Sequence, residues 1–102
     1  MLVIVDFCLV PLGVGVSLSP YIARCQTIFE NAGLAYTMHA YGTNIEGEWQ
    51  AVFAAIEECH RMIHEMGAPR ITSTIKLGTR SDKTQHMQDK INSVERILSH
   101  DD

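Results

Sequence analysis

The chain has 102 residues, of which 46% are apolar and 20% charged, and its formal net charge is −4. This composition is typical of a globular protein and excludes a disordered one. The negative balance argues against a nucleic-acid partner, which would require a basic face. No apolar run reaches the length of a membrane-spanning helix, so we expect no membrane partner. We expect one domain over residues 1–102.

The cysteines indicate the redox compartment. Cys8, Cys25 and Cys59 are widely spaced, odd in number and contain no CxxC pair. This arrangement predicts no disulfide framework. A reducing environment is the simplest account, so we expect a cytoplasmic protein.

The first third of the chain predicts a strand followed by a helix. Residues Leu2 to Val10 are almost continuously apolar and rich in valine, as in a central strand covered on both faces. Ser19 is a good N-cap and Pro20 suits the first helical position. The apolar stripe that follows ends near Gly33, which can close the helix in a left-handed conformation.

A hairpin and a second helix are predicted next. Ala35 to Tyr41 and Thr43 to about Glu46 read as two short strands joined tightly at Gly42. Helical spacing then recurs at Trp49, Val52, Phe53, Ile56, Cys59 and Ile63.

The remainder predicts one more strand and a last helix. Arg70 to Leu77 alternates between apolar and polar residues, which indicates a strand with one buried face. A helix is expected from Ser81 or Asp82 to Ser99. Its apolar positions form a narrow seam of the kind that packs against another helix: Met87, Ile91, Val94 and Leu98.

The predicted order is β-α-β-β-α-β with an additional C-terminal helix. This matches the α+β ferredoxin-like arrangement, with two helices on one face of a four-stranded antiparallel sheet. The uncovered face would carry Leu2, Ile4, Asp6, Cys8, Thr72, Thr74 and Lys76. Exposed apolar residues in such a patch usually mark contacts. We therefore expect self-association into a homodimer or homotetramer through this face, the last helix, or both.

The segment Gly42 to Trp49 is the most informative part of the sequence. It combines two glycines, two acids, a threonine and the only tryptophan where the hairpin should lead into the helix. Two interpretations are open. The segment is either a helix-entry turn without a ligand, or a site that captures a small, flat, polar molecule.

Asp6 is the sharpest anomaly, because it lies in a strand otherwise composed of apolar residues. A buried carboxylate requires a partner or water. Lys76 and Thr74 are expected on the same face of a neighbouring strand. Two interpretations are open. Either Asp6 belongs to a structural ion pair or a solvated open face, or the three residues are polar side chains that line a ligand cavity.

The remaining candidate sites each have a simpler explanation. Gly13 to Gly15 precedes a helix and could receive a phosphate, or is a flexible loop. Lys76, Arg80 and Lys83 could bind an anionic tail, or form a solvated turn with Asp82.

No metal centre or catalytic motif is evident. His60 and His64 lie four residues apart on a helix, but no third ligand accompanies them, so surface histidines are preferred over a metal site. Cys59 falls in a helical stripe, which favours packing over nucleophilic catalysis. We expect no cofactor.

Several short motifs, in order along nearly the whole chain, together resemble the small YkoF-like thiamine-binding family. They are Pro11-Leu12-Gly13, Ser17-Leu18-Ser19-Pro20-Tyr21, Gly33-Leu34-Ala35-Tyr36, Gly42-Thr43-Asn44-Ile45-Glu46-Gly47-Glu48-Trp49 and Arg70-Ile71-Thr72-Ser73-Thr74-Ile75-Lys76. The ending resembles the fungal branch of that family, in Gly78-Thr79-Arg80-Ser81-Asp82-Lys83 and Gln88-Asp89-Lys90-Ile91.

This resemblance implies a ferredoxin-like protomer, assembled into dimers or tetramers, that binds thiamine or its hydroxymethylpyrimidine portion without catalysis. For the pyrimidine, we expect an apolar slot built from Ile4, Leu12, Met38 or Trp49. Candidate polar partners are Thr43, Glu46, Asp6 and Thr74. A phosphate ester would favour Lys76 or Arg80.

Three functions therefore compete. The first is a non-catalytic binding protein for thiamine or a related pyrimidine. The second is a self-associating structural protein without a ligand. The third is an enzyme on a small polar substrate, with Asp6 or Glu46 as acid or base. We expect the first.

Overall fold

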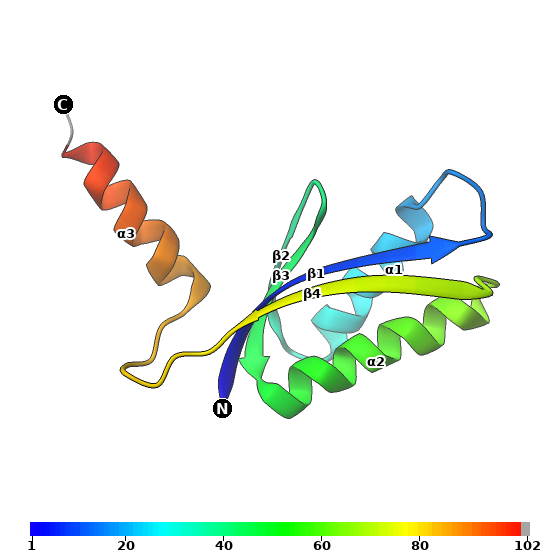
Figure 1. The fold of residues 1–102 in the computed structure, drawn as a ribbon, viewed down its shortest axis with the longest axis horizontal. Helices are drawn as coiled ribbons and strands as arrows, with labels where there is room; N and C mark the ends of the chain where they lie inside the picture. The colour runs from blue at the N-terminus through cyan, green and yellow to red at the C-terminus, as the bar shows by residue number, and fades with distance from the viewer. Residues whose placement is uncertain (101–102) are drawn as a thin grey trace.

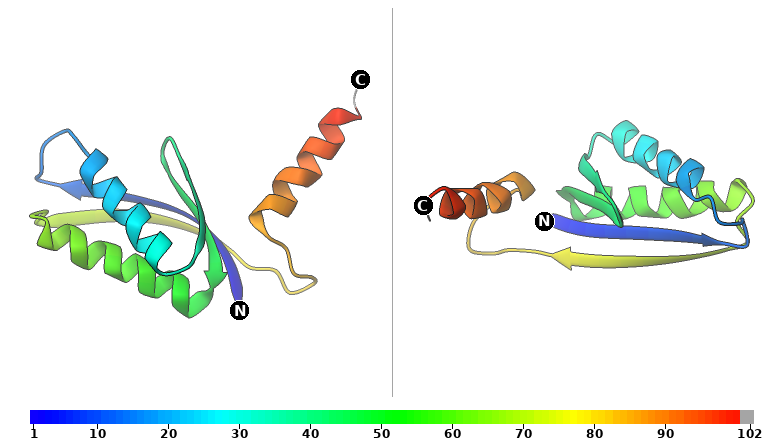
Figure 2. Two further views of the ribbon diagram at one scale, coloured as in Figure 1. Left: turned by 180° about the vertical axis from the view of Figure 1, so that it is seen from behind. Right: turned by 90° about the horizontal axis from the view of Figure 1, so that it is seen from above.

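The computed structural model describes residues 1–100 and contains the predicted succession of strands and helices. The elements are β1 (Leu2–Leu12), α1 (Ser19–Asn31), β2 (Ala35–His39), β3 (Gly42–Glu48), α2 (Trp49–Glu65), β4 (Arg70–Gly78) and α3 (Met87–Ser99). The strands form one antiparallel sheet in the order β2-β3-β1-β4. Helices α1 and α2 cover one face of it (Figures 1 and 2). The predicted ferredoxin-like α+β fold is confirmed.

The core forms between β1 and the two helices. Alternate residues of β1, namely Val3, Val5, Phe7 and Leu9, point toward the helices and are at most 3% exposed. Phe29 of α1 is fully buried and meets Phe7 edge-to-face, with ring centroids 6.0 Å apart. Because side chains alternate along a strand, one face of β1 supplies most of the sheet's contribution to the core.

The opposite face of the sheet has no layer on it, so the expectation that β1 is covered on both faces is wrong. The register pairs Asp6 with Lys76 and Cys8 with Thr74, which confirms the predicted composition of this face. Asp6 and Lys76 are exposed, and Cys8 is half-buried. The right-hand view of Figure 2 shows both helices on one side of the strands.

The segment Gly42 to Trp49 contains the predicted strand, which runs as far as Glu48 and leaves no separate turn before α2. Its first seven residues form β3, which pairs with β1 on one side and β2 on the other. Leu34 packs closely on Gly47, since a Cβ at that position would lie 2.7 Å from Leu34 Cδ2. Two neighbouring strands satisfy the backbone of this segment, which explains why it stays extended.

Two helix starts also differ from expectation. Leu18, and not Ser19, is the N-cap of α1, and no side chain caps the helix. Helix α3 begins at Met87, several residues later than predicted, because His86 and Asp89 form a capping box there. The side chain of Arg80 meanwhile holds Asp82 and Gln85 in the preceding loop.

Helix α3 stands away from the sheet (Figure 1). None of its residues is buried, and Ile91, Val94 and Leu98 are 48 to 63% exposed. The Cα radius of gyration is 15.5 Å, above the roughly 13 Å of a compact domain of about 100 residues. The apolar seam of α3 therefore has no helix to pack against within residues 1–100.

Among the helices in the described part of the chain, none has both the length and the apolar character needed to cross a membrane.

Replacing Phe29 by Ala should lower the free energy of unfolding by about 3–5 kcal/mol, because it removes a fully buried ring from the contact with Phe7. Urea denaturation measures the loss. Val16→Ala is the control, since Val16 is fully exposed and its truncation should change stability by less than about 0.5 kcal/mol. Similar losses in both variants would contradict this account of the core.

Candidate functional site

A large hollow lies where the β2–β3 hairpin leaves the central strand. β1 pairs with β4 as far as Leu12, but with β3 only as far as Phe7. Beyond Phe7, one side of β1 faces α1 and the hairpin and borders a groove of about 1080 Å³. We call this hollow the α1–hairpin groove. Its size suits a small-molecule ligand.

The lining of the α1–hairpin groove is mostly apolar and holds few polar side chains. The apolar lining comes from all three elements and includes Phe7, Leu9, Leu18, Ile22 and Met38. The polar side chains are Ser19, Gln26, His39, Tyr41 and Thr43. No lysine or arginine lines the groove. An apolar cavity with a few fixed polar groups is the usual form of a ligand site.

Gln26 and Thr43 form the polar centre of this groove. Gln26 Nε2 donates to Thr43 Oγ1 at 2.9 Å, joining α1 to β3. Thr43, at 4% exposure, is the one buried polar residue among residues 1–100. Gln26 Oε1 is shielded from solvent and has no hydrogen-bond partner among the described residues. A buried acceptor without a donor costs free energy, so this wall can accept one further donor.

At the hairpin end of the groove, the lining residue His39 pairs with Asp6, which lies outside the lining. His39 Nε2 and Asp6 Oδ1 are 2.8 Å apart, and Tyr41 N donates to His39 Nδ1 at 3.3 Å. Because His39 Nδ1 accepts that bond, Nε2 carries the proton that His39 donates to Asp6. Gly42 leaves space for this pair, since a Cβ there would lie 3.3 Å from Asp6 Oδ1 and 2.7 Å from Phe7 O.

The first turn of α1 borders the groove but has few free donors. Tyr21 N and Ile22 N both donate to Leu18 O, at 3.0 and 3.1 Å. Pro20 has no N–H to offer. This helix N-terminus is therefore a poor anion site, although helix N-termini often bind phosphate.

Of the ligand-contact residues predicted from sequence, two line the α1–hairpin groove: Met38 and Thr43. Asp6 lies on the opposite face of the sheet and reaches the groove only through His39. Thr74 and Lys76 lie on that face too, and Lys76 has no ion-pair partner among residues 1–100. The interpretation of Asp6 as part of a solvated face is the one that fits.

The other predicted contacts lie elsewhere. Ile4 and Arg80 line a second, smaller cleft at the start of β1. Leu12 is exposed at the far end of β1. Trp49 opens α2, where its ring packs against Phe53 in a tilted arrangement with centroids 5.0 Å apart. The structure therefore does not bring the ten predicted residues together at one site.

Glu46 of β3 connects the sheet to the start of α3. Its Oε2 accepts from His86 Nδ1 at 3.1 Å and from the Met87 backbone at 3.3 Å. The Glu46 side chain is only 14% exposed. A carboxylate at a helix N-terminus complements the helix dipole, so Glu46 fixes the start of α3 to the sheet.

Sequence reasoning missed Gln26 and His39 as site residues. Gln26 is a polar side chain beside the apolar stripe of α1, next to buried Cys25. That irregularity is a usable signal, because an amide at the edge of a buried stripe requires a partner. His39 shows no such signal, since its contact with Asp6 depends on the sheet register.

His60, His64, Cys25 and Cys59 each contact a neighbouring group of the fold. His60 Nε2 contacts Ser73 Oγ at 2.9 Å, and His64 Nδ1 contacts Ala68 O at 2.8 Å. Burial lowers the pKa of His60. Cys25 and Cys59 are buried and contact each other, and this contact, together with burial, raises the pKa of the Cys59 thiol. Residues 1–100 contain no cluster of three or more potential metal ligands.

Comparison with known proteins gives one family. The sequence pattern of the family described as "Thiamine-binding protein" matches residues 5–95. An UPF0045 protein of Synechocystis sp. is 59% identical over 96% of this chain and 81% of its own length. UPF0045 protein ECM15 of the fungus Eremothecium gossypii is 43% identical over 94% of this chain and 92% of its own. The fungal relative supports the predicted link to the fungal branch.

Solved structures share the fold. A hypothetical protein of Methanocaldococcus jannaschii superposes with a TM-score of 0.86 at 26% identity, over 92% of this chain and 96% of that one. A candidate thiamine biosynthesis/salvage protein of Thermotoga maritima superposes with a TM-score of 0.78 at 19% identity, over 92% and 99% of the two chains. At that lower identity the likeness concerns the fold.

Replacing Thr43 by Val should lower the free energy of unfolding by about 1–3 kcal/mol, because the Gln26 amide loses its acceptor at a buried position. Thr43→Ser is the matched control, since it keeps the hydroxyl. Urea denaturation of the three proteins makes the comparison. An equal loss in both variants would mean that the Thr43 methyl, and not the hydrogen bond, stabilises this wall.

Proposed function

The chain belongs to the thiamine-binding protein family, and on that premise we propose that it binds thiamine or its hydroxymethylpyrimidine portion in the α1–hairpin groove, without catalysing a reaction. The observation that carries the proposal is the hydrogen-bonded pair of Gln26 and Thr43 in the wall of an otherwise apolar groove. A flat, weakly polar ring system with a few hydrogen-bonding groups suits such a lining.

The aminopyrimidine ring matches the polar centre of the groove. It carries an amino group, which donates, beside a ring nitrogen, which accepts. Gln26 Oε1 has a free acceptor position, and the Thr43 hydroxyl can donate a hydrogen bond while it accepts one from Gln26. A small rotation of the Gln26 amide would bring this acceptor to the ligand. The apolar side chains of Phe7, Ile22 and Met38 would contact the faces of the ring.

The thiazolium ring of thiamine is a cation and suits the hairpin end of the groove. The Asp6 carboxylate lies next to His39 there and supplies negative charge. Tyr41 is 87% exposed on the hairpin and lines the same end. An aromatic face near a cation attracts it, so Tyr41 is well placed to cover the thiazolium.

The groove offers a phosphate group no cationic side chain. It has no lysine or arginine in its lining, and Tyr21 N and Ile22 N at the start of α1 already donate to Leu18 O. Phosphate recognition depends on such charged or backbone donors. We therefore propose that the unphosphorylated forms are the ligands of this groove.

Calorimetric titration should give saturable binding of thiamine and of hydroxymethylpyrimidine, and thiamine diphosphate should bind no more tightly than thiamine. Gln26→Leu keeps the side-chain size and removes the amide, so it should weaken thiamine binding by about tenfold or more, since one lost buried hydrogen bond is worth about 1.5 kcal/mol. Mass spectrometry should recover the ligand unchanged after prolonged incubation.

Arg61→Gln is the control for this titration, because Arg61 lies on the outside of α2 and pairs with Glu57 and Glu58. Its binding should equal that of the wild-type protein. Absence of heat with any of these ligands at millimolar concentration would refute the proposal. Conversion of the ligand during incubation would refute its non-catalytic part.

We further propose that copies of the chain associate through the uncovered sheet face and α3. Leu2, Ile4 and Cys8 are half-buried on that face, and the α3 seam is exposed. Exposed apolar surfaces of this kind usually mark contacts, and a stable interface buries roughly 800 Å² on each partner.

Sedimentation equilibrium at micromolar concentration should give a dimer or tetramer. Val94→Asp places a charge in the exposed α3 seam and should shift the protein toward monomer, because a buried unpaired charge is costly. Asn92→Asp adds the same charge to α3 outside its apolar seam and should leave the assembly intact. A wild-type monomer at this concentration would exclude self-association as a feature of the protein.

A further inference from the structure

The sheet leaves the backbone N–H and C=O of Leu9 unpaired. Opposite residues of antiparallel strands alternate between positions that exchange backbone hydrogen bonds and positions that do not. Trp49 N donates to Met1 O at 2.9 Å, which identifies the bonded positions between β1 and β3. Every second residue of β1 from Met1 to Phe7 therefore bonds to β3. Leu9 is the next residue of this set, but the pairing with β3 has ended at Phe7.

These two groups of Leu9 point into the α1–hairpin groove. On the other side of β1, β4 bonds to the alternate residues, such as Cys8. No backbone group among residues 1–100 bonds to the N–H or the C=O of Leu9. Leu9 lines the groove and is only 3% exposed. A shielded donor and acceptor without partners cost free energy, so they favour a ligand that satisfies both.

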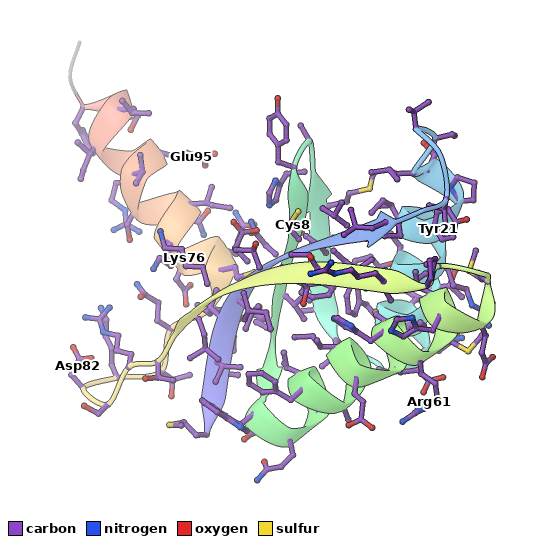
Figure 3. The ribbon with its side chains drawn as sticks, turned by 45° about the vertical axis from the view of Figure 1, so that its right-hand side comes forward. Cys8, Tyr21, Arg61, Lys76, Asp82 and Glu95 are labelled. Carbon is purple, nitrogen blue, oxygen red and sulfur yellow. The ribbon has the colours of Figure 1, made fainter. Side chains whose placement is uncertain are left out.

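The Leu9 pair is reached from the groove and not from the uncovered sheet face. Backbone hydrogen-bonding groups lie in the plane of a sheet, whereas side chains point to its two faces. In Figure 3, Cys8 lies on β1 beside the hairpin, and Tyr21 lies on α1 farther along the strand. Association of copies through the uncovered face and α3 would therefore leave this pair open to a ligand.

The free edge of β1 suits a small molecule better than a peptide strand. An added strand requires a row of backbone donors and acceptors. The next residue of the same set after Leu9 is Pro11, which has no N–H. One donor and one acceptor on a single residue therefore remain. A hydroxyl group, which donates and accepts at one atom, matches such a pair.

We propose that the Leu9 backbone pair binds the free hydroxyl group of hydroxymethylpyrimidine, and that the groove thereby selects this alcohol. The inference rests on the proposed function, in which Gln26 and Thr43 bind the amino group and the ring nitrogen. Leu9 lies two residues along β1 from Phe7, the partner of Thr43, a distance of roughly 7 Å. A pyrimidine ring with its hydroxymethyl group spans a similar length. The Leu9 N–H donates to the hydroxyl oxygen, and the hydroxyl donates to the Leu9 carbonyl.

Phosphorylation of the alcohol, or its replacement by thiamine, removes this contact. A phosphate ester has no hydroxyl proton at the esterified oxygen. Its negative charge would lie beside the Leu9 carbonyl, in a groove whose lining has no lysine or arginine to offset it. In thiamine the same carbon is bonded to the thiazolium ring, so it carries no hydroxyl group. Thiamine therefore occupies the groove without the bonds to Leu9.

The test compares hydroxymethylpyrimidine with the analogue in which a methyl group replaces the hydroxymethyl group. In calorimetric titration of the full chain, the analogue should bind about tenfold more weakly, since it leaves the Leu9 pair unsatisfied. The methyl ether, which keeps the oxygen and loses the proton, and the phosphate ester should also bind more weakly than the alcohol. In two-dimensional NMR, the Leu9 amide proton should move downfield with the alcohol and not with the analogue or thiamine.

Gln26→Leu separates this contact from the one on which the proposed function depends. It should weaken binding of the alcohol and of the methyl analogue by the same factor, because the Leu9 pair does not involve the Gln26 amide. Equal affinity of the alcohol and the analogue, or an unmoved Leu9 amide proton, would overturn this inference and leave thiamine binding in place. Absence of binding by every one of these compounds would refute the proposed function as well.

Discussion

The central strand is paired over different lengths on its two sides, and the candidate binding site depends on this inequality. β1 runs beside β4 to Leu12, whereas its pairing with β3 ends at Phe7 and Thr43. The hairpin departs at that point, while α1 continues above the strand (Figure 1). The resulting space is lined by the free side of β1, one helix and the hairpin. Thr43 occupies the last paired position and faces the helices, where it meets Gln26 of α1.

Carboxylates near the two hollows are held in pairs with donors, and this pairing limits the charge that each hollow presents to a ligand. Four carboxylates near the two hollows already hold structural partners: Asp6 with His39, Glu46 with His86, Glu48 with the N-terminus and Asp82 with Arg80. The lining of the α1–hairpin groove contains no carboxylate, lysine or arginine, and the Asp6 carboxylate lies behind the lining residue His39. Since these exposed pairs contribute little to stability individually, their main effect is on local charge.

The fold was predictable because the sequence signals agree with one another. Alternation in β4, the helical stripes of α1 and α2, and the left-handed Gly33 and Gly67 all point to the same succession of elements. The uncovered face followed from the parity of β1 and β4. The candidate site was predictable only in part, through Met38 and Thr43. Gln26 meets Thr43 across 17 residues, and His39 meets Asp6 across 33, so tertiary packing alone decides these contacts.

Gly42 illustrates how a residue without a side chain can govern recognition. Its Cα lies so close to the carbonyl of Phe7 that no methyl group fits between them. This close contact fixes the position of the hairpin beside the central strand. The width of the groove at the hairpin end depends on that position. The room for a guest in this groove therefore depends on a backbone contact, which a list of the side chains that touch the guest would not include.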